Sequence, residues 1–282
     1  METLTSGDAD VHKQIHETRK SIKRLRAVLR LGRRGIGGKV FRREDAFLSG
    51  VAKTLSDTRD MAAMLSCIEK LAPQVSDDQQ ALLRQLSTEV TKQAESAAAE
   101  ATAASGVLIA VTTQFQEARE RLGAIQFHAD TFKALEKSLK EIYRDGRSLM
   151  GHISQEGDAN MIHQWRKKAK HLWYDMLILS DIWPAVTIPL ASEIHALAET
   201  LGFHHDLEVL LIALDGQTLL KGKTKGKTKL IKTVRDLQET MLRQAMPLGG
   251  KIYSLKTGSF VDCLNAWWNI WRLTHTSLTP AL

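Results

Sequence analysis

Residues 11–30 read VHKQIHETRKSIKRLRAVLR, and this stretch decides the fold class. Its basic side chains recur every three or four residues from His12 to Arg33, which places them in one stripe along an α-helix. An apolar stripe runs one residue earlier, from Val11 to Leu29, and one residue is a rotation of about 100°. The basic stripe therefore borders the face that packs into the core and is expected to line a groove between helices.

The rest of the chain has the same helical character. Only five of its 282 residues are proline, and no segment alternates apolar and polar residues as a half-buried strand does. We predict an all-α protein, because apolar residues recur with helical spacing through most of the chain. The predicted helical stretches are residues 11–31, 45–70, 77–120, 129–153, 160–181, 187–214, 228–245 and 257–275, with the third either continuous or broken near Ser105-Gly106.

The sequence also bears on the compartment. Two cysteines without metal-ligand spacing are typical of a reducing environment. Residues 1–10 are polar and acidic, so we expect a disordered N-terminus and no secretory signal. No apolar run approaches the roughly 20 residues that a membrane-spanning helix needs. These features predict a cytoplasmic protein.

The net charge of +7 is concentrated in a few segments. Residues 11–34 carry nine Lys and Arg against one acid, and residues 163–171 carry four against none. Residues 133–147 carry five against three, and residues 221–232 carry six lysines against none. These segments together hold +20, so the remaining chain has a net charge of −13. Basic elements on an acidic body predict a site for an anion.

The motif of the first stretch returns later in the chain. Residues 16–25 follow the pattern H-x-x-R-K-x-x-K-[RH]-L, which recurs at an offset of 147 from His163. Residues 55–61 match residues 201–207 at an offset of 146. Two matches that share nearly one offset indicate an internal duplication.

Two further basic segments add to the pattern. A third stripe, spaced by four and three residues, consists of Lys133, Lys137, Lys140, Arg144 and Arg147. Residues 221–229 read KGKTKGKTK and have no apolar anchor, so we expect a flexible basic loop. This loop either contacts the anion or only raises solubility.

These motifs together resemble those of the conserved histidine α-helical domain (CHAD) family. The resemblance covers residues 11–275 and rests on the two His-x-x-Arg motifs, on Tyr143-Arg-x-Gly-Arg147, and on residues 201–210. It implies one domain of two pseudo-symmetric four-helix bundles, residues 11–154 and 160–275, with a basic central channel. It also implies binding of inorganic polyphosphate and association with polyphosphate granules.

The resemblance and the basic segments together assign the expected contacts with polyphosphate. Two positions depart from the family pattern, because Trp173 stands where a basic residue is usual and Ser56 where a glycine is usual. We therefore expect the second half to bind less tightly. The expected contacts are His16, Arg19, Lys20, Lys23, Arg24, Arg26, Arg30, Lys140, Tyr143, Arg144, Arg147, His163, Arg166, Lys167 and Lys170.

Two other functions stay open. The basic helices could bind nucleic acid, although a stripe beside the core suits a major groove less well than one facing outward. His204-His205-Asp206 could hold a divalent metal in a phosphohydrolase, although the matching residues 58–60 contain no histidine. We predict binding without catalysis, without a cofactor and without a metal.

The last helical stretch is rich in tryptophan. Its apolar residues follow helical spacing and predict a helix of the core. The alternative is a surface that docks on a granule or a partner protein. The residues are Phe260, Val261, Leu264, Trp267, Trp268 and Trp271.

Overall fold

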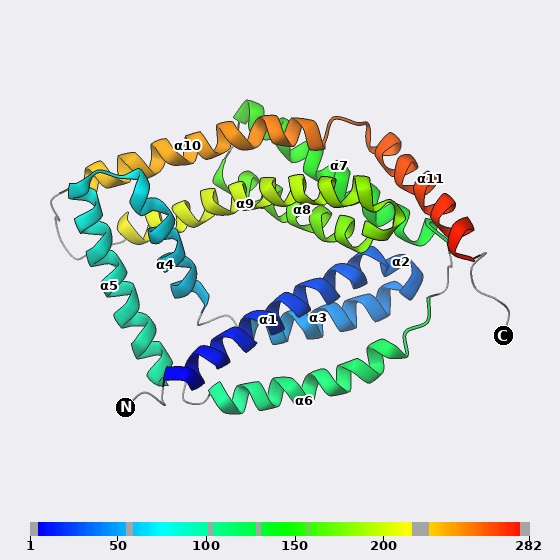
Figure 1. Cartoon of the computed structure of the whole chain (residues 1–282), viewed down its shortest axis with the longest axis horizontal. Coiled ribbons are helices and arrows are strands. Elements are labelled where there is room, and N and C mark those ends of the chain that lie inside the picture. Colours follow the sequence, from blue (N-terminus) through cyan, green and yellow to red (C-terminus); the bar gives the residue numbers. More distant parts are fainter. Residues whose placement is uncertain are drawn as a thin grey trace. The chain divides into compact units, whose positions relative to one another are not determined.

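The computed structural model describes residues 5–54, 59–100, 104–127, 131–156, 158–215 and 226–276. These residues form helices joined by turns and contain no strand, which confirms the predicted all-α class (Figure 1). The α-helices are α1 (Thr5–Leu31), α2 (Arg33–Ile36), α3 (Gly38–Thr54), α4 (Arg59–Leu71), α5 (Asp77–Glu100), α6 (Ala104–Gly123), α7 (Lys133–Glu156), α8 (Ala159–Ile178), α9 (Pro184–Asp215), α10 (Lys227–Ile252) and α11 (Thr257–Thr276). Single 3₁₀ turns are η1 (Ala72–Gln74) and η3 (Ser180–Ile182).

Several helix boundaries differ from the predicted ones. The expected helix over residues 45–70 is two helices, and α3 begins earlier, directly after Gly37, whose φ of 84° favours glycine. α1 begins at Thr5, inside the segment expected to be disordered. α10 begins at Lys227, so the end of the expected basic loop is helical, and residues 221–225 lie outside the described residues.

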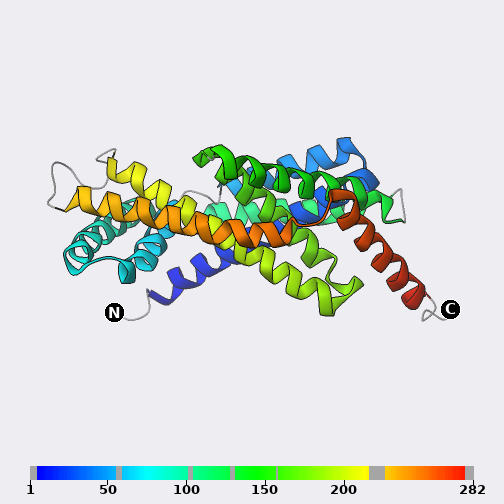
Figure 2. The same ribbon diagram turned by 90° about the horizontal axis from the view of Figure 1, so that it is seen from above.

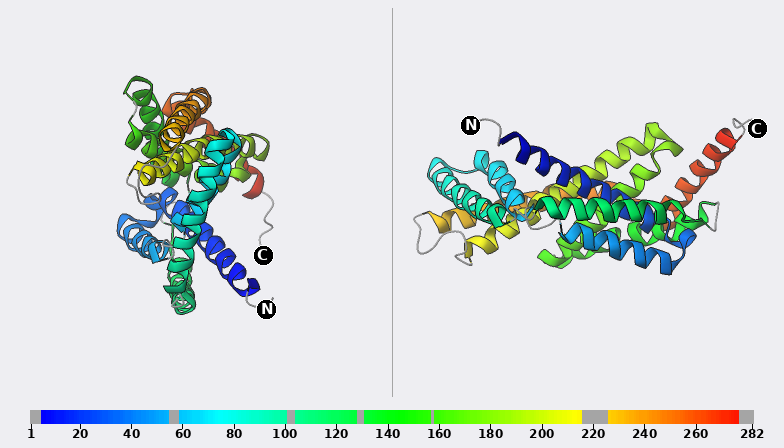
Figure 3. Two further views of the ribbon diagram at one scale, coloured as in Figure 1. Left: turned by 90° about the vertical axis from the view of Figure 1, so that its left-hand side faces the viewer. Right: turned by 90° about the horizontal axis from the view of Figure 1, so that it is seen from below.

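The chain divides into two compact units, and the first comprises residues 1–59 and 97–138. In this unit α1 turns through α2 into α3, and the two long helices pack together (Figure 3). α6 covers their apolar face and joins the same core. The buried residues of this core are Ile22, Leu29, Ile36, Leu48 and Val51, and Phe115, Leu122 and Ile125 of the α6 region pack against them.

The second unit comprises residues 60–96 and 139–282. α8 and α9 form a hairpin, and α10 runs along α9 (Figure 2). One apolar core of this unit combines α4 and α5 with α9 and α10, so helices from both expected halves share it. The core contains Cys67, Ile68, Leu71, Leu82, Leu83, Leu86, Val90, Leu207, Leu210, Leu211, Leu214, Leu230 and Val234.

The hairpin α1–α3 corresponds to the hairpin α8–α9. α1 ends at Leu31 and α8 ends at Ile178, which are 147 residues apart, and the single turns α2 and η3 also begin 147 residues apart. Buried positions match in the same register, as in Leu29 with Met176. An internal duplication predicts this correspondence. The described cores, however, do not follow the expected division into one bundle for each half.

α11 is buried over its first half only. Phe260, Val261 and Leu264 belong to the core, whereas Ile270 and Leu273 are 62% and 71% exposed. None of the helices in the described ranges, α11 included, is long and apolar enough to cross a membrane.

Candidate anion-binding site

The basic residues of α1 border a pocket in the first unit. The pocket has a volume of about 390 Å³ and lies between α1 and α3, because residues of both helices line it. The Arg19 guanidinium reaches across to α3 and donates a hydrogen bond to the backbone carbonyl of Ala52 at 3.3 Å. The lining residues are Arg19, Ile22, Lys23, Arg26, Ser49, Ala52 and Lys53.

One of these cations is already paired. The Arg26 guanidinium donates to both carboxylate oxygens of Asp45, from Nε at 2.8 Å and from Nη2 at 3.2 Å. This two-point contact orients the guanidinium and balances its charge. The other basic residues of the lining are Arg19, Lys23 and Lys53.

The other expected contacts on α1 lie outside the pocket lining. Lys20 forms an exposed ion pair with Glu17 at 3.7 Å, and Arg24 is exposed. Arg30 is half-buried and lies one helical turn after Arg26. His16 belongs to α1, but its side chain lies outside the described residues.

The matching residues of α8 face the middle of α9 in the second unit. The ring of His163 lies against the ring of His205, with 4.3 Å between their centroids. Within the described part of the chain, His163 Nδ1 and Arg166 Nε are buried and have no hydrogen-bond partner. Gly202 leaves room for Arg166, because a Cβ there would lie 3.4 Å from the Nε atom. Lys167 is exposed beside them.

This cluster favours neutral histidines. Burial lowers the pKa of His163, and the nearby His205, Lys167 and Arg166 lower it further. Burial and Arg166 also lower the pKa of His205, against a smaller opposing effect of Glu208. A bound phosphate would oppose these effects, because an anion favours the protonated ring.

The neighbouring His204 has a different environment. It is 7% exposed, and burial lowers its pKa. The Gln238 amide of α10 donates to the backbone carbonyl of His204 and to the carboxylate of Glu208. Among the residues that the structure describes, no three His, Cys, Asp or Glu side chains are grouped to hold a metal ion.

Tyr143 on α7 does not fit its expected role as a ligand contact. Its side chain is fully buried, and its hydroxyl lies 3.1 Å from the carbonyl oxygen of Ile252 and 3.2 Å from that of Leu255. Its ring stacks on Phe260 with 4.1 Å between centroids. Tyr143 therefore holds α7 against the end of α10 and the start of α11, and its buried side chain has a structural role.

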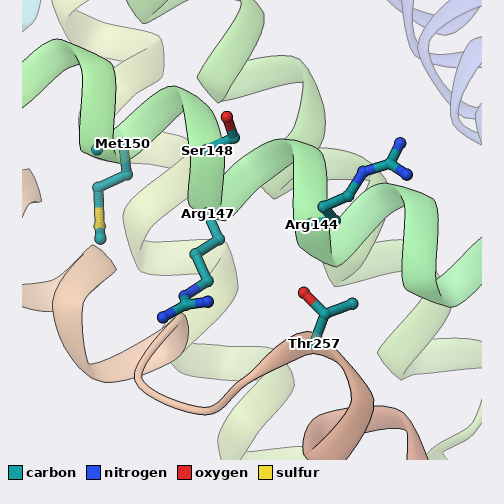
Figure 4. Close-up of a pocket in the computed structure, with 6 residues that line it drawn as sticks. Arg144, Arg147, Ser148, Met150 and Thr257 are labelled. Atoms are coloured by element: carbon teal, nitrogen blue, oxygen red, sulfur yellow. The ribbon is translucent and has the colours of Figure 1, made fainter.

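The two arginines that follow Tyr143 in sequence, Arg144 and Arg147, are exposed. Arg147 lines a pocket of about 410 Å³ between α7 and the first residue of α11, Thr257 (Figure 4). Arg144 lines the same pocket and also pairs with Asp145 at 2.8 Å. Lys168 of α8 binds the second oxygen of this carboxylate at 2.8 Å, which ties α8 to α7. Lys140, half-buried one turn before Arg144, completes the stripe.

Sequence reasoning missed three residues of these sites. Ser49 and Lys53 line the α1–α3 pocket, and His205 contacts His163. For Ser49 and Lys53 the repeat offered a signal in the sequence, because its offset of 146 aligns them with His195 and Glu199 of α9. His205 stood out only as a possible metal ligand, since its contact with α8 depends on how two helices pack.

A comparison with protein families identifies the class of protein. The family model described as CHAD domain matches residues 2–215, which span α1 to α9. The chain belongs to this family. No curated protein and no solved structure matches the chain.

Proposed function

We propose that the chain binds a linear polyanion, inorganic polyphosphate, and that it does so without catalysis. One observation carries the proposal: two corresponding helical hairpins present Arg and Lys at the same positions of their first helix, Arg19 and Lys23 on α1 and Arg166 and Lys170 on α8. Membership of the CHAD family supports the same ligand. We further propose that the protein acts in the cytoplasm, at polyphosphate granules.

The chemistry of the basic residues suits such a ligand. Polyphosphate carries about one negative charge per phosphate, so its binding releases condensed counterions, as the binding of nucleic acid does. Arginine offers a forked donor to phosphate oxygens, and lysine a mobile point charge. At about 1.5 Å per residue, the part of the stripe that lies on α1, from His12 to Arg30, extends roughly 27 Å, which suits an extended chain.

A titration with long-chain polyphosphate tests the proposal. The variants are Arg19→Ala/Lys23→Ala and Arg166→Ala/Lys170→Ala, and Arg84→Ala/Lys92→Ala on α5 removes two exposed charges as a control. Each of the first two should lower affinity by roughly tenfold or more at ~50 mM salt, because each lost contact lowers the salt slope by about 0.7. The control should bind like the wild type. No binding by the wild type at ~50 mM salt would refute the proposal.

Two further measurements separate the other functions. Duplex DNA that displaces polyphosphate at equal charge concentration would favour a nucleic-acid ligand. Release of phosphate from polyphosphate that a chelator stops would indicate a metal-dependent hydrolase. We expect neither result.

A further inference from the structure

The pocket between α1 and α3 has a counterpart between α8 and α9 that differs in charge. The offsets of the repeat align Lys23 with Lys170, and they align Lys53 of α3 with Glu199 of α9. In the first hairpin both aligned positions are lysines and both line the pocket. In the second hairpin, Lys170 Nζ lies 3.9 Å from the carboxylate of Glu199. A protein carboxylate thus lies where an anionic ligand would balance the lysine.

The second hairpin also differs in shape at this point. Trp173 aligns with Arg26, and His195 aligns with Ser49. The two rings stack with 4.0 Å between centroids and an angle of 6° between their planes. His195 Nδ1 lies 3.9 Å from the same Glu199 carboxylate. Two stacked rings therefore stand at the positions that an arginine and a serine hold in the first hairpin.

We propose that the α1–α3 pocket is a phosphate subsite that only the first hairpin provides, with Lys53 and Ser49 as contacts beyond the expected set. In the second hairpin, Glu199 acts as an internal counter-anion for Lys170, which lies one turn after Arg166 on α8. It thereby lowers the affinity of this hairpin for phosphate. This inference rests on the proposed function, because it assigns unequal roles to the two halves of that site. The ligand at the subsite is one or two phosphate units of the polyphosphate chain.

Charge neutralisation at the two aligned positions tests this asymmetry. Lys53→Gln should weaken binding of long-chain polyphosphate about three- to eightfold at ~50 mM salt and lower the salt slope by about 0.7, as the loss of one phosphate contact does. Glu199→Gln should instead strengthen binding, and Glu199→Lys should strengthen it more. Both residues are exposed, Glu199 by 56%, so the variants should fold normally.

Matched controls remove the effect of net charge. Lys92→Gln on α5 and Glu193→Gln on α9 make the same charge changes at exposed positions outside both pockets. These controls should change the affinity for polyphosphate much less than Lys53→Gln and Glu199→Gln do. If Lys53→Gln and Glu199→Gln bind like their controls while the wild type binds tightly, the asymmetry is refuted and the proposed function stands. If the wild type itself fails to bind, the proposed function is lost.

Discussion

At the scale of single residues, the environment of each basic group distinguishes binding from structural roles. Arg26 and Arg19 both border the α1–α3 pocket, but Arg26 is held by Asp45 whereas Arg19 contacts a backbone carbonyl. Tyr143 belongs to the same family motif as Arg147, yet the tyrosine is buried and the arginine is exposed. The basic pattern and the family resemblance had placed all four among the expected contacts.

The pair His163 and His205 should make binding depend on pH. Both histidines have lowered pKa values in the free protein, so they are neutral near pH 7. A bound anion raises these pKa values, so binding takes up protons and affinity rises as the pH falls from about 7.5 towards 6. Each proton taken up contributes at most about tenfold per pH unit.

Titrations at several pH values check this coupling. The double variant His163→Gln/His205→Gln should lose most of the pH dependence, whereas His275→Gln at the exposed end of α11 should keep it. A double variant with an unchanged pH profile would show that other groups carry the coupling.

At the scale of helices, close packing of α7 against the α10–α11 turn sets the position of Arg144 and Arg147. Gly146 allows this contact, because a Cβ at that position would lie 2.5 Å from the hydroxyl of Tyr253. The family motif places this glycine between the two arginines. The motif therefore needs a small residue at this position because a larger one would overlap with Tyr253.

Replacing Gly146 with alanine should destabilise the protein relative to the same change at Gly151. Both glycines lie in α7, and alanine favours a helix by about 1 kcal/mol at either position. At Gly151 no atom lies within 4 Å of the added Cβ, so Gly151→Ala should be neutral or stabilising. Overpacking at Gly146 should cost about 1–3 kcal/mol against that gain. Denaturant unfolding of both variants measures the difference, and equal stabilities would contradict the packing account.

At the scale of the molecule, one described core draws its helices from both sequence halves. α4 and α5 come from the first half, yet they share an apolar core with α9 and α10 from the second. Core residues such as Leu86 and Leu207 are fully buried. The predicted boundary between the halves, near residue 157, therefore does not separate the helices of this core.

Cleavage between the halves should therefore leave them associated. A protease site introduced over residues 155–158, from the last residues of α7 to the residue before α8, allows the chain to be cut after folding. The two fragments should elute together in size-exclusion chromatography, because separation would expose the shared apolar core to water. They should separate only in denaturant. If the fragments elute separately under native conditions, this core does not hold the halves together.

The sequence predicted the features that depend on local periodicity. The helical class, the basic stripes and the two matching motifs follow from residue spacing along single helices, such as that of Arg19 and Lys23. The corresponding ends of α1 and α8 agree with the offset of the repeat. The break between α3 and α4 escaped prediction, because no proline or glycine marks residues 55–58.

The sequence by itself determined an all-α chain with repeated basic helices, because helical periodicity and repeat offsets are properties of neighbouring residues. Only the tertiary structure decided that Tyr143 is buried, that His163 meets His205, and that Lys170 faces Glu199. It also decided that α4 and α5 pack with α9 and α10. These features depend on which helix surfaces meet across long sequence separations, and each amphipathic face has several apolar partners that would satisfy it equally well.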